Sequence, residues 1–328
     1  MNWSGKKVLV TGAGGFIGSH LSEELVKRGA DTYGFVHYNS QGNHGWLDKS
    51  DLRNDIEIIS GDITNIESVL QAMSGIDIVF HLAALVAIPY SLIAPRSYIL
   101  TNVHGTLNVL EAAKKLHTET LIHTSSSEVY GTANYVPIDE AHPLQGQSPY
   151  SASKIGADKM VEAYHYSYGL PVTTIRPFNT FGPRQLSRAV VPSIISQALT
   201  QDKIHLGNLS PTRDFNYVSD TVEGFIKIAE CKSAIGKAFN IGSGREIAIG
   251  DIAHMICGLL GYPDMRITHD PQRVRPEGGE VERLCCQSNF AKKTFGWAPK
   301  YTLEQGLEQT ITWIKSNLDQ YRLGTYEI

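Results

Sequence analysis

The sequence predicts a doubly wound α/β protein, with a parallel sheet and a second, smaller lobe. Short β-branched segments alternate with segments of helical periodicity from residue 7 onward. A glycine-rich turn joins the first strand to the first helix. The chain has 328 residues, of which 42% are apolar, enough for one compact core or for two lobes that share an interface.

Parallel strands require long crossover connections, and the spacing of the predicted strands provides them. Such crossovers are almost always right-handed helices, so helices should cover both faces of the sheet. The first predicted helix covers residues 16–28, and two longer helices cover residues 95–116 and 149–168. The predicted strands are residues 8–10, 32–36, 56–59, 76–82, 120–124 and 172–176.

The pattern changes after Phe178, where Gly182, Pro183 and Pro192 interrupt it. A strand–helix rhythm returns only between residues 217 and 241, and the tail from Arg245 is mixed and rich in loops. We therefore expect a nucleotide-binding domain of residues 1–178 plus about 214–244. The second lobe would consist of residues 179–213 and 245–328.

Composition excludes several classes of protein. The net charge is −4 and no run of five like charges occurs, which argues against nucleic acid or an anionic membrane as partner. No stretch of 18 apolar residues appears and no leader precedes the first strand, so we expect a cytoplasmic protein. The four cysteines lack CxxC spacing and the histidines form no ligand cluster, which predicts reduced thiols and no metal site.

The glycine-rich turn predicts dinucleotide binding. Gly12, Gly15 and Gly18 are three residues apart, between a strand and a helix. Gly12 permits a sharp turn, Gly15 lets a pyrophosphate approach the backbone N–H groups where Phe16 and Ile17 begin the helix, and Gly18 allows close packing of helix on strand. This arrangement is typical of a Rossmann domain that binds NAD(P)+.

The end of the second predicted strand bears on the choice of cofactor. An acid there usually binds the adenosine ribose of NAD+. None is present, whereas His37, Asn39 and Ser40 offer polar groups that could hold a 2′-phosphate, so the sequence slightly favours NADP+ and leaves NAD+ open. Asp62, after the third strand, is placed to accept a hydrogen bond from the adenine amino group.

Tyr150 and Lys154 lie four residues apart, on one face of a predicted helix. A lysine cation near a tyrosine favours the phenolate and lowers the pKa of the phenol, which would make the pair a general base for a hydroxyl undergoing oxidation. Residues 126–128, Ser-Ser-Glu, follow a strand whose carboxyl end should face the cofactor crevice.

Together these motifs resemble the extended short-chain dehydrogenase/reductase family, specifically its nucleotide-sugar members. The resemblance rests on TGxxGxxG, HLAA at residues 81–84, SSxEVYG and YxxxK, in this order, and it covers residues 7–297. It implies a catalytic role for Ser126, Tyr150 and Lys154, and a homodimer in which the two long helices form a four-helix bundle. The further cofactor contacts that it implies are Ile63, Leu82, Ala83 and Asn102.

Within that family, Glu128 indicates a 4,6-dehydratase. Sugar 4-epimerases commonly carry a small residue at this position, whereas dehydratases carry a glutamate that removes the C5 proton once C4 is a ketone. The dTDP-glucose enzymes have Thr-Asp-Glu where this chain has Ser126-Ser127-Glu128, and in this respect the chain resembles GDP-mannose 4,6-dehydratases. Whether Glu128 or Ser127 would protonate the departing C6 oxygen stays open.

The second lobe carries the predicted substrate contacts. The resemblance implies that Asn179, Arg213 and Arg275 hold the substrate diphosphate and that Arg184 also binds the substrate, and guanidinium groups suit such a dianion. Residues 144–159 and 207–215 are similar to the 4,6-dehydratases of the legionaminic acid pathway, which implies GDP-N-acetylglucosamine as substrate. The alternatives are a UDP-sugar 4-epimerase, a UDP-glucuronate decarboxylase and, more remotely, a non-catalytic NAD(P)-binding protein.

Overall fold

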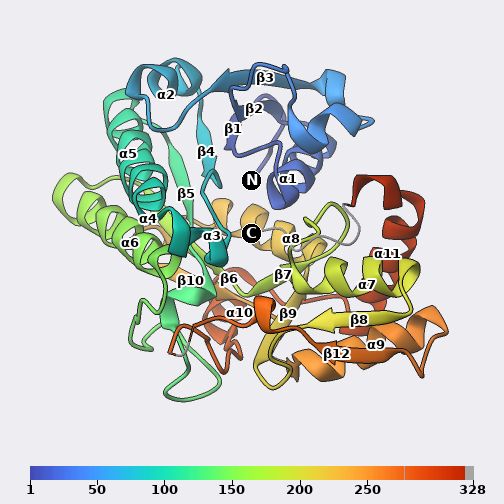
Figure 1. Ribbon diagram of the computed structural model, residues 1–328. Helices are drawn as coiled ribbons and strands as arrows, with labels where there is room; N and C mark the ends of the chain where they lie inside the picture. Colours follow the sequence, from blue (N-terminus) through green and yellow to red (C-terminus); the bar gives the residue numbers. More distant parts are fainter. Residues whose placement is uncertain (277, 322–328) are drawn as a thin grey trace.

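Seven parallel strands form the central sheet of the computed structural model, which describes residues 1–276 and 278–321 (Figure 1). Across the sheet their order is β10-β6-β5-β4-β1-β2-β3. The order reverses between β1 and β4, which opens a crevice at the carboxyl ends of the strands. The predicted doubly wound sheet is confirmed. Its strands are β1 (Lys7–Thr11), β2 (Asp31–His37), β3 (Ile56–Gly61), β4 (Ile78–His81), β5 (Thr120–Thr124), β6 (Val172–Pro177) and β10 (Ala238–Ile241).

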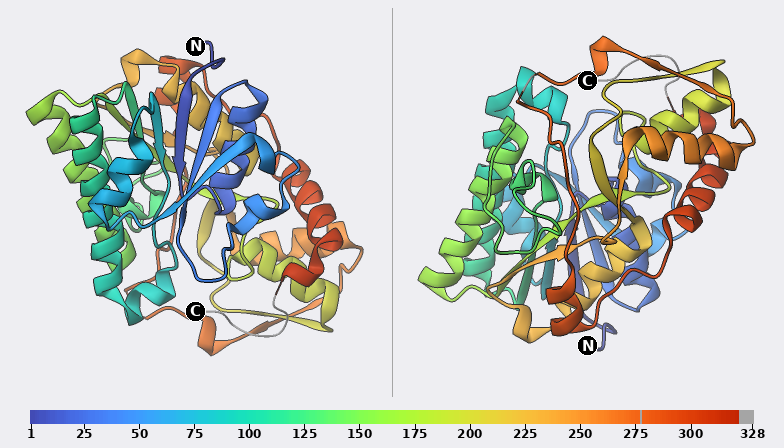
Figure 2. Two further views of the ribbon diagram at one scale, coloured as in Figure 1. Left: turned by 90° about the horizontal axis from the view of Figure 1, so that it is seen from above. Right: turned by 90° about the horizontal axis from the view of Figure 1, so that it is seen from below.

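Helices cover both faces of this sheet (Figure 2). One layer contains α2 (Ile66–Met73), α5 (Gly105–Leu116) and α6 (Pro149–Tyr168), and the other contains α1 (Phe16–Lys27) and α8 (Val218–Ala229). Because both faces are covered, central strands such as β4 are buried along their whole length. The crevice at the strand ends is therefore held by a rigid, fully packed sheet.

The predicted helix at residues 95–116 is a composite of three helical segments. It consists of α4 (Pro95–Tyr98), a π-helical segment (Ile99–His104) and α5, and the short helix α3 (Ile88–Ile93) precedes it. Asn102, inside the π-helical segment, is buried and hydrogen-bonds the backbone of Leu85 and the hydroxyl of Ser153. These contacts provide a physical reason for the local π geometry, which hydrophobic periodicity does not encode.

Helix α6 begins and ends where the sequence predicts. Ser148 and Ser151 form a reciprocal capping box, with Pro149 at the first helical position, and Gly169 ends the helix with a φ of 65°. This start places Tyr150 in the first turn of the helix, where the chain leaves the sheet crevice.

The smaller lobe contains two further sheets. Strands β7 (Asn179–Phe181), β9 (Thr212–Tyr217) and β11 (Glu246–Ala248) form one, and β8 (Lys203–Leu206) with β12 (Arg266–His269) forms the other. Helices α7 (Val190–Thr200), α9 (Ile249–Leu260) and α11 (Leu303–Ser316) pack around them, and α10 (Asn289–Phe295) packs against β10. Within the described residues, no helix combines the length and apolar character that crossing a bilayer requires.

Candidate active site

The turn between β1 and α1 leaves no space for a side chain at Gly12 or Gly18. Gly12 has a φ of 72°, and a Cβ there would lie 2.9 Å from the backbone of Ala83. A Cβ on Gly18 would lie 2.2 Å from the carbonyl oxygen of Gly12. Gly15 occupies the N-cap of α1, and no side chain caps this helix start. The first N–H groups of α1, among them those of Phe16 and Ile17, thus suit the pyrophosphate of a dinucleotide.

Several predicted cofactor residues lie at or just after the carboxyl ends of β2, β3 and β4. The backbone N–H groups of Leu82 and Ala83 both bond to the hydroxyl of Thr11, which brings β4 against the turn. Asp62 accepts hydrogen bonds from Thr64, and its second oxygen lies 3.5 Å from Nε2 of His37.

Three further predicted cofactor residues have structural partners. Ile63 accepts a bond from Asn108 through its carbonyl oxygen, and Asn102 braces Leu85 and Ser153. The Asn39 side chain accepts from the N–H groups of Gln41 and Asn43 and donates to the carbonyl of Asn43. Its polar atoms are therefore used to stabilise the turn of residues 39–43. His37 is exposed and retains polar atoms that a ligand could reach.

Tyr150 lies on α6, almost fully buried, with its ring edge against Tyr98. Burial raises the pKa of its phenol, a hydrogen bond with Ser126 lowers it, and the charge of Glu128 raises it again. The expected lowering of the Tyr150 pKa is therefore wrong for this site. Desolvation outweighs the other effects there, because a phenolate loses its hydration in the crevice wall.

Lys154 follows one turn later and is also buried. Its Nζ donates to the carbonyl oxygen of Thr124, at the end of β5, over 2.7 Å. Burial lowers the pKa of the ammonium group to about 8, although the charge of Asp158 raises it. The amine therefore changes between its cationic and neutral forms close to neutral pH.

The residues after β5 form a tight turn beside Tyr150. Ser126 caps the 3₁₀ turn Ser127–Tyr130 by accepting from the N–H of Glu128 over 3.2 Å. Ser127 and Glu128 are both buried. In the part of the chain that the structure describes, no salt bridge engages the Glu128 carboxylate. A buried carboxylate without a cationic partner is available for proton transfer.

Two of the predicted substrate arginines converge on one carboxylate. Arg213 Nη2 and Arg275 Nη1 donate to the same oxygen of Glu280, over 2.9 and 3.2 Å. Asn179 lies on β7, and its buried side-chain oxygen has no hydrogen-bond partner among the described residues. The two guanidinium groups exceed the charge of Glu280 by one, so an anionic ligand would compete with Glu280 for them, and the unsatisfied amide of Asn179 suits a polar group.

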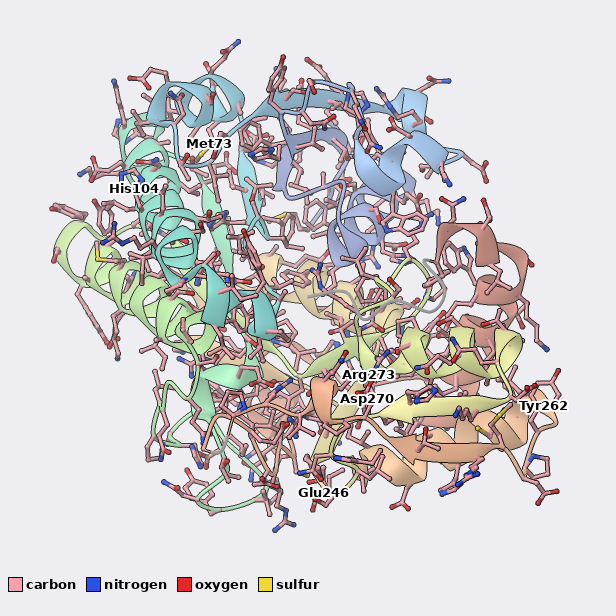
Figure 3. All side chains as sticks on the ribbon, in the orientation of Figure 1. Met73, His104, Glu246, Tyr262, Asp270 and Arg273 are labelled. Carbon is pink, nitrogen blue, oxygen red and sulfur yellow. The ribbon has the colours of Figure 1, made fainter. Side chains whose placement is uncertain are left out.

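Arg184 points elsewhere. Its Nη2 donates to Glu23 of α1 over 2.8 Å, so in this structure it joins the smaller lobe to the main domain. Arg273 and Asp270, both labelled in Figure 3, form a salt bridge, and Arg273 also reaches Ser193 of α7. These contacts hold the segment that carries Arg275.

Sequence reasoning missed Glu280 and Asp158. Glu280 follows Arg275 by five residues in a glycine-containing loop, and nothing in its local pattern indicates that it turns back onto the arginines. Asp158 follows Lys154 by four residues, and this helical spacing could have revealed that the two side chains share a face. Among the described residues, no cluster of three potential metal ligands occurs.

Comparison with known proteins gives a consistent result along nearly the whole chain. The family model described as GDP-mannose 4,6 dehydratase matches residues 9–310. A dTDP-glucose 4,6-dehydratase from Xanthomonas campestris pv. campestris is 33% identical, over 94% of this chain and 93% of its own length. A UDP-glucose 4-epimerase from Mycolicibacterium smegmatis is 32% identical, over 94% and 99%.

A solved structure has the same fold. The dTDP-glucose 4,6-dehydratase of Streptomyces venezuelae, solved with NAD bound, matches with a TM-score of 0.87 and 27% identity. The match covers 96% of this chain and 98% of that one.

Proposed function

We propose, since this chain belongs to the GDP-mannose 4,6-dehydratase family of extended short-chain dehydrogenases/reductases, that it converts a hexose nucleotide into a 4-keto-6-deoxy sugar. The observation that carries this proposal is Glu128. Its carboxylate is buried and forms no salt bridge within the described residues. Glu128 follows the carboxyl end of β5, and its charge raises the pKa of Tyr150. A 4-epimerase needs no such group, whereas elimination of water requires a base for the C5 proton.

The residues around the crevice divide the proton transfers among them. Once it has lost its own proton, the Tyr150 oxygen would accept the proton of the C4 hydroxyl; the hydrogen bond from Ser126 and the positive charge of Lys154 would stabilise this phenolate. Glu128 would take the C5 proton and deliver it to the C6 oxygen, which leaves as water. The hydride taken from C4 would then return to C6, and C5 would regain a proton that balances the one lost by the C4 hydroxyl. Ser127, buried beside it, is the other candidate donor for that oxygen.

NAD(P)+, when bound, supplies reversible hydride acceptance, so that the reaction is redox-neutral. The glycine turn and the uncapped start of α1 would hold its pyrophosphate, and Asp62 its adenine. No carboxylate follows the second strand, so we propose that NADP+ binds at least as tightly as NAD+. Titration of the protein with each dinucleotide tests this, and clear selectivity for NAD+ would contradict it.

The smaller lobe would bind the sugar nucleotide, with its diphosphate between Arg213 and Arg275 and one polar group on Asn179. Following the resemblance of residues 144–159 and 207–215, we propose GDP-N-acetylglucosamine as the substrate. The same proposal assigns residues 1–178 and about 214–244 to cofactor binding, and residues 179–213 and 245–328 to substrate binding.

Product mass tests this assignment against its alternatives. The protein is incubated with NAD+ or NADP+ and GDP-N-acetylglucosamine, UDP-N-acetylglucosamine, dTDP-glucose or UDP-glucuronate. Dehydration lowers the product mass by one water, decarboxylation by one carbon dioxide, and epimerisation leaves it unchanged. The 4-epimerase is the second candidate, because a relative of that name matches nearly as well. If all four compounds kept their mass and an epimer of any of them formed, the protein would be a 4-epimerase instead.

We also propose a homodimer through the outer helices. Large apolar groups are exposed on α3, the π-helical segment and α6, namely those of Ile93, Ile99, Leu100 and Tyr166. Light scattering after gel filtration measures the molar mass directly, and a monomer at micromolar concentration would refute the dimer. The four free thiols, three of them buried, suit a reducing cytoplasm.

A further inference from the structure

A buried carboxylate lies behind the Tyr150–Lys154 pair, and the chemistry proposed above assigns it no role. Asp158 follows Lys154 by four residues on α6, so the two side chains lie on one face of the helix. Its side chain is only 4% exposed. A carboxylate this deeply buried is unstable unless other groups satisfy its oxygens.

Side chains from two adjacent strands satisfy the Asp158 oxygens. One oxygen lies 3.2 Å from His123 Nε2, at the end of β5. The other accepts from Ser125 Oγ over 2.9 Å, and from Arg176 of β6 through Nε and Nη2, over 3.1 and 3.0 Å. Because each donor is itself buried, these bonds fix the position of the carboxylate closely.

Stability alone is a weak reason for such an arrangement. A buried ion pair loses much of its Coulomb energy to desolvation, and an apolar pair of similar volume is often equally stable. The Asp158–Arg176 pair, in contrast, lies one helical turn from a second buried cation. Lys154 has a neutral carbonyl as its hydrogen-bond acceptor, at Thr124, and that carbonyl brings no full charge.

Few of the groups around Lys154 carry charge at neutral pH. Burial lowers the pKa of both His81 and His123, which keeps these rings neutral. Tyr98 and Tyr150 are neutral phenols whose pKa burial raises. The charge of Asp158 raises the pKa of Lys154, against the larger lowering by burial. The titratable groups facing this region are Tyr150, Tyr98 of α4, Glu128, His81 of β4, His123 of β5 and Arg176 of β6.

We propose that Asp158 is a positioning residue whose fixed carboxylate keeps Lys154 in its cationic form, and that His123 and Arg176 suffice to hold this carboxylate in place. The proposal rests on the proposed function, in which the Lys154 cation supports the Tyr150 oxygen. A neutral amine could still donate a hydrogen bond there. It would supply no positive charge to balance the charge that develops on the phenol oxygen.

The test replaces Asp158 with asparagine, which has nearly the same shape and no charge. Protein labelled with 13C at the lysine ε carbons is titrated by NMR without cofactor, and the Lys154 signal is identified by its absence in Lys154→Met. Asp158→Asn should lower the Lys154 midpoint by about one pH unit or more. The alkaline limb of the turnover profile should shift in the same direction, because the active fraction of Lys154 is lost at lower pH.

Ser125→Ala is the matched control. It removes one hydrogen bond from the same carboxylate and leaves the charge, so the midpoint should stay close to that of the wild type. Asp158→Asn leaves Arg176 buried and unpaired, which can unfold the chain. The comparison is therefore repeated between Arg176→Gln and the double variant Asp158→Asn/Arg176→Gln, and the double variant should again have the lower midpoint.

An unchanged midpoint in folded Asp158→Asn, or in the folded double variant relative to Arg176→Gln, would overturn the proposal. An equal fall in Ser125→Ala and Asp158→Asn would also overturn it, because packing and not charge would then control Lys154. The NMR midpoint needs no substrate. A protein without dehydratase activity on any sugar nucleotide would refute the proposed function and leave this measurement intact.

Discussion

Replacement of Gly18 by alanine tests the cofactor turn, because the added methyl group has no room. A Cβ at this position lies 2.2 Å from the carbonyl oxygen of Gly12, and ordinary contact begins at 3.4 Å. The turn and α1 must therefore separate by about 1.2 Å, which is 3.4 minus 2.2. The next nearest atoms are the Gly12 carbonyl carbon and the Ala13 Cα. All three belong to the backbone, so no side chain can rotate away.

Such overpacking costs about 1–3 kcal/mol of folding free energy. A displacement of about 1 Å also lengthens hydrogen bonds between the start of α1 and a pyrophosphate beyond a useful distance, so we expect NAD+ and NADP+ to bind at least about tenfold more weakly. Calorimetric titration and urea unfolding measure the two effects.

The control for this substitution is Gly258→Ala. Gly258 lies within α9, where a Cβ would meet no atom within 4 Å. Alanine there should stabilise the helix by up to about 1 kcal/mol and leave cofactor affinity unchanged. Wild-type affinity and stability in Gly18→Ala would refute the reasoning about the turn.

Three further predictions concern the smaller lobe and its junction with the main domain. One oxygen of Asp214 accepts from the N–H groups of Gly244 and Cys286, and the other accepts from the N–H and the hydroxyl of Ser243. The amide in Asp214→Asn can replace only one of these two acceptors, so at least one backbone N–H loses its partner and the unfolding free energy in urea should fall by about 1–3 kcal/mol; an unchanged free energy would contradict this. Burial lowers the pKa of His20 to about 4 from 6.5, so its contribution to stability is present above pH 6.5 and is lost as the pH falls toward 4. Between pH 7 and pH 5 the unfolding free energy of the wild type should fall by about 2 kcal/mol more than that of His20→Gln. Equal falls in urea titrations would exclude a role of His20 in this pH dependence. Arg213→Lys keeps the charge but loses the guanidinium fork, and should raise the KM for the nucleotide sugar about tenfold with a smaller effect on kcat; an unchanged KM would remove Arg213 from the substrate site.

Local signals made much of the fold predictable. Helix α6 was predicted at residues 149–168, and it begins and ends there because Ser148, Pro149 and Gly169 act within a few residues of its ends. The glycine turn was equally readable, since Gly12 and Gly18 meet within one strand–helix junction. The parallel, doubly wound sheet with helices on both faces followed from the general rule for right-handed crossovers.

Long-range pairing explains what the sequence could not predict. Arg184 pairs with Glu23, which is 161 residues away, and Arg213 pairs with Glu280, 67 residues away. No local pattern encodes such partners, since tertiary folding brings them together. The burial of Tyr150, which reverses the expected direction of its pKa shift, likewise depends on packing against Tyr98 and on the closed turn after β5.

The most direct measurement of the central claim is a single-turnover reaction of Glu128→Gln with a sugar nucleotide that the wild type dehydrates. Glutamine keeps the size of the side chain in this buried turn and removes the base. We predict that absorbance of reduced cofactor accumulates while the sugar keeps its C6 oxygen, because C4 oxidation proceeds and water loss stops. Loss of water at the wild-type rate in this variant would contradict the assignment of Glu128 as the base for the C5 proton.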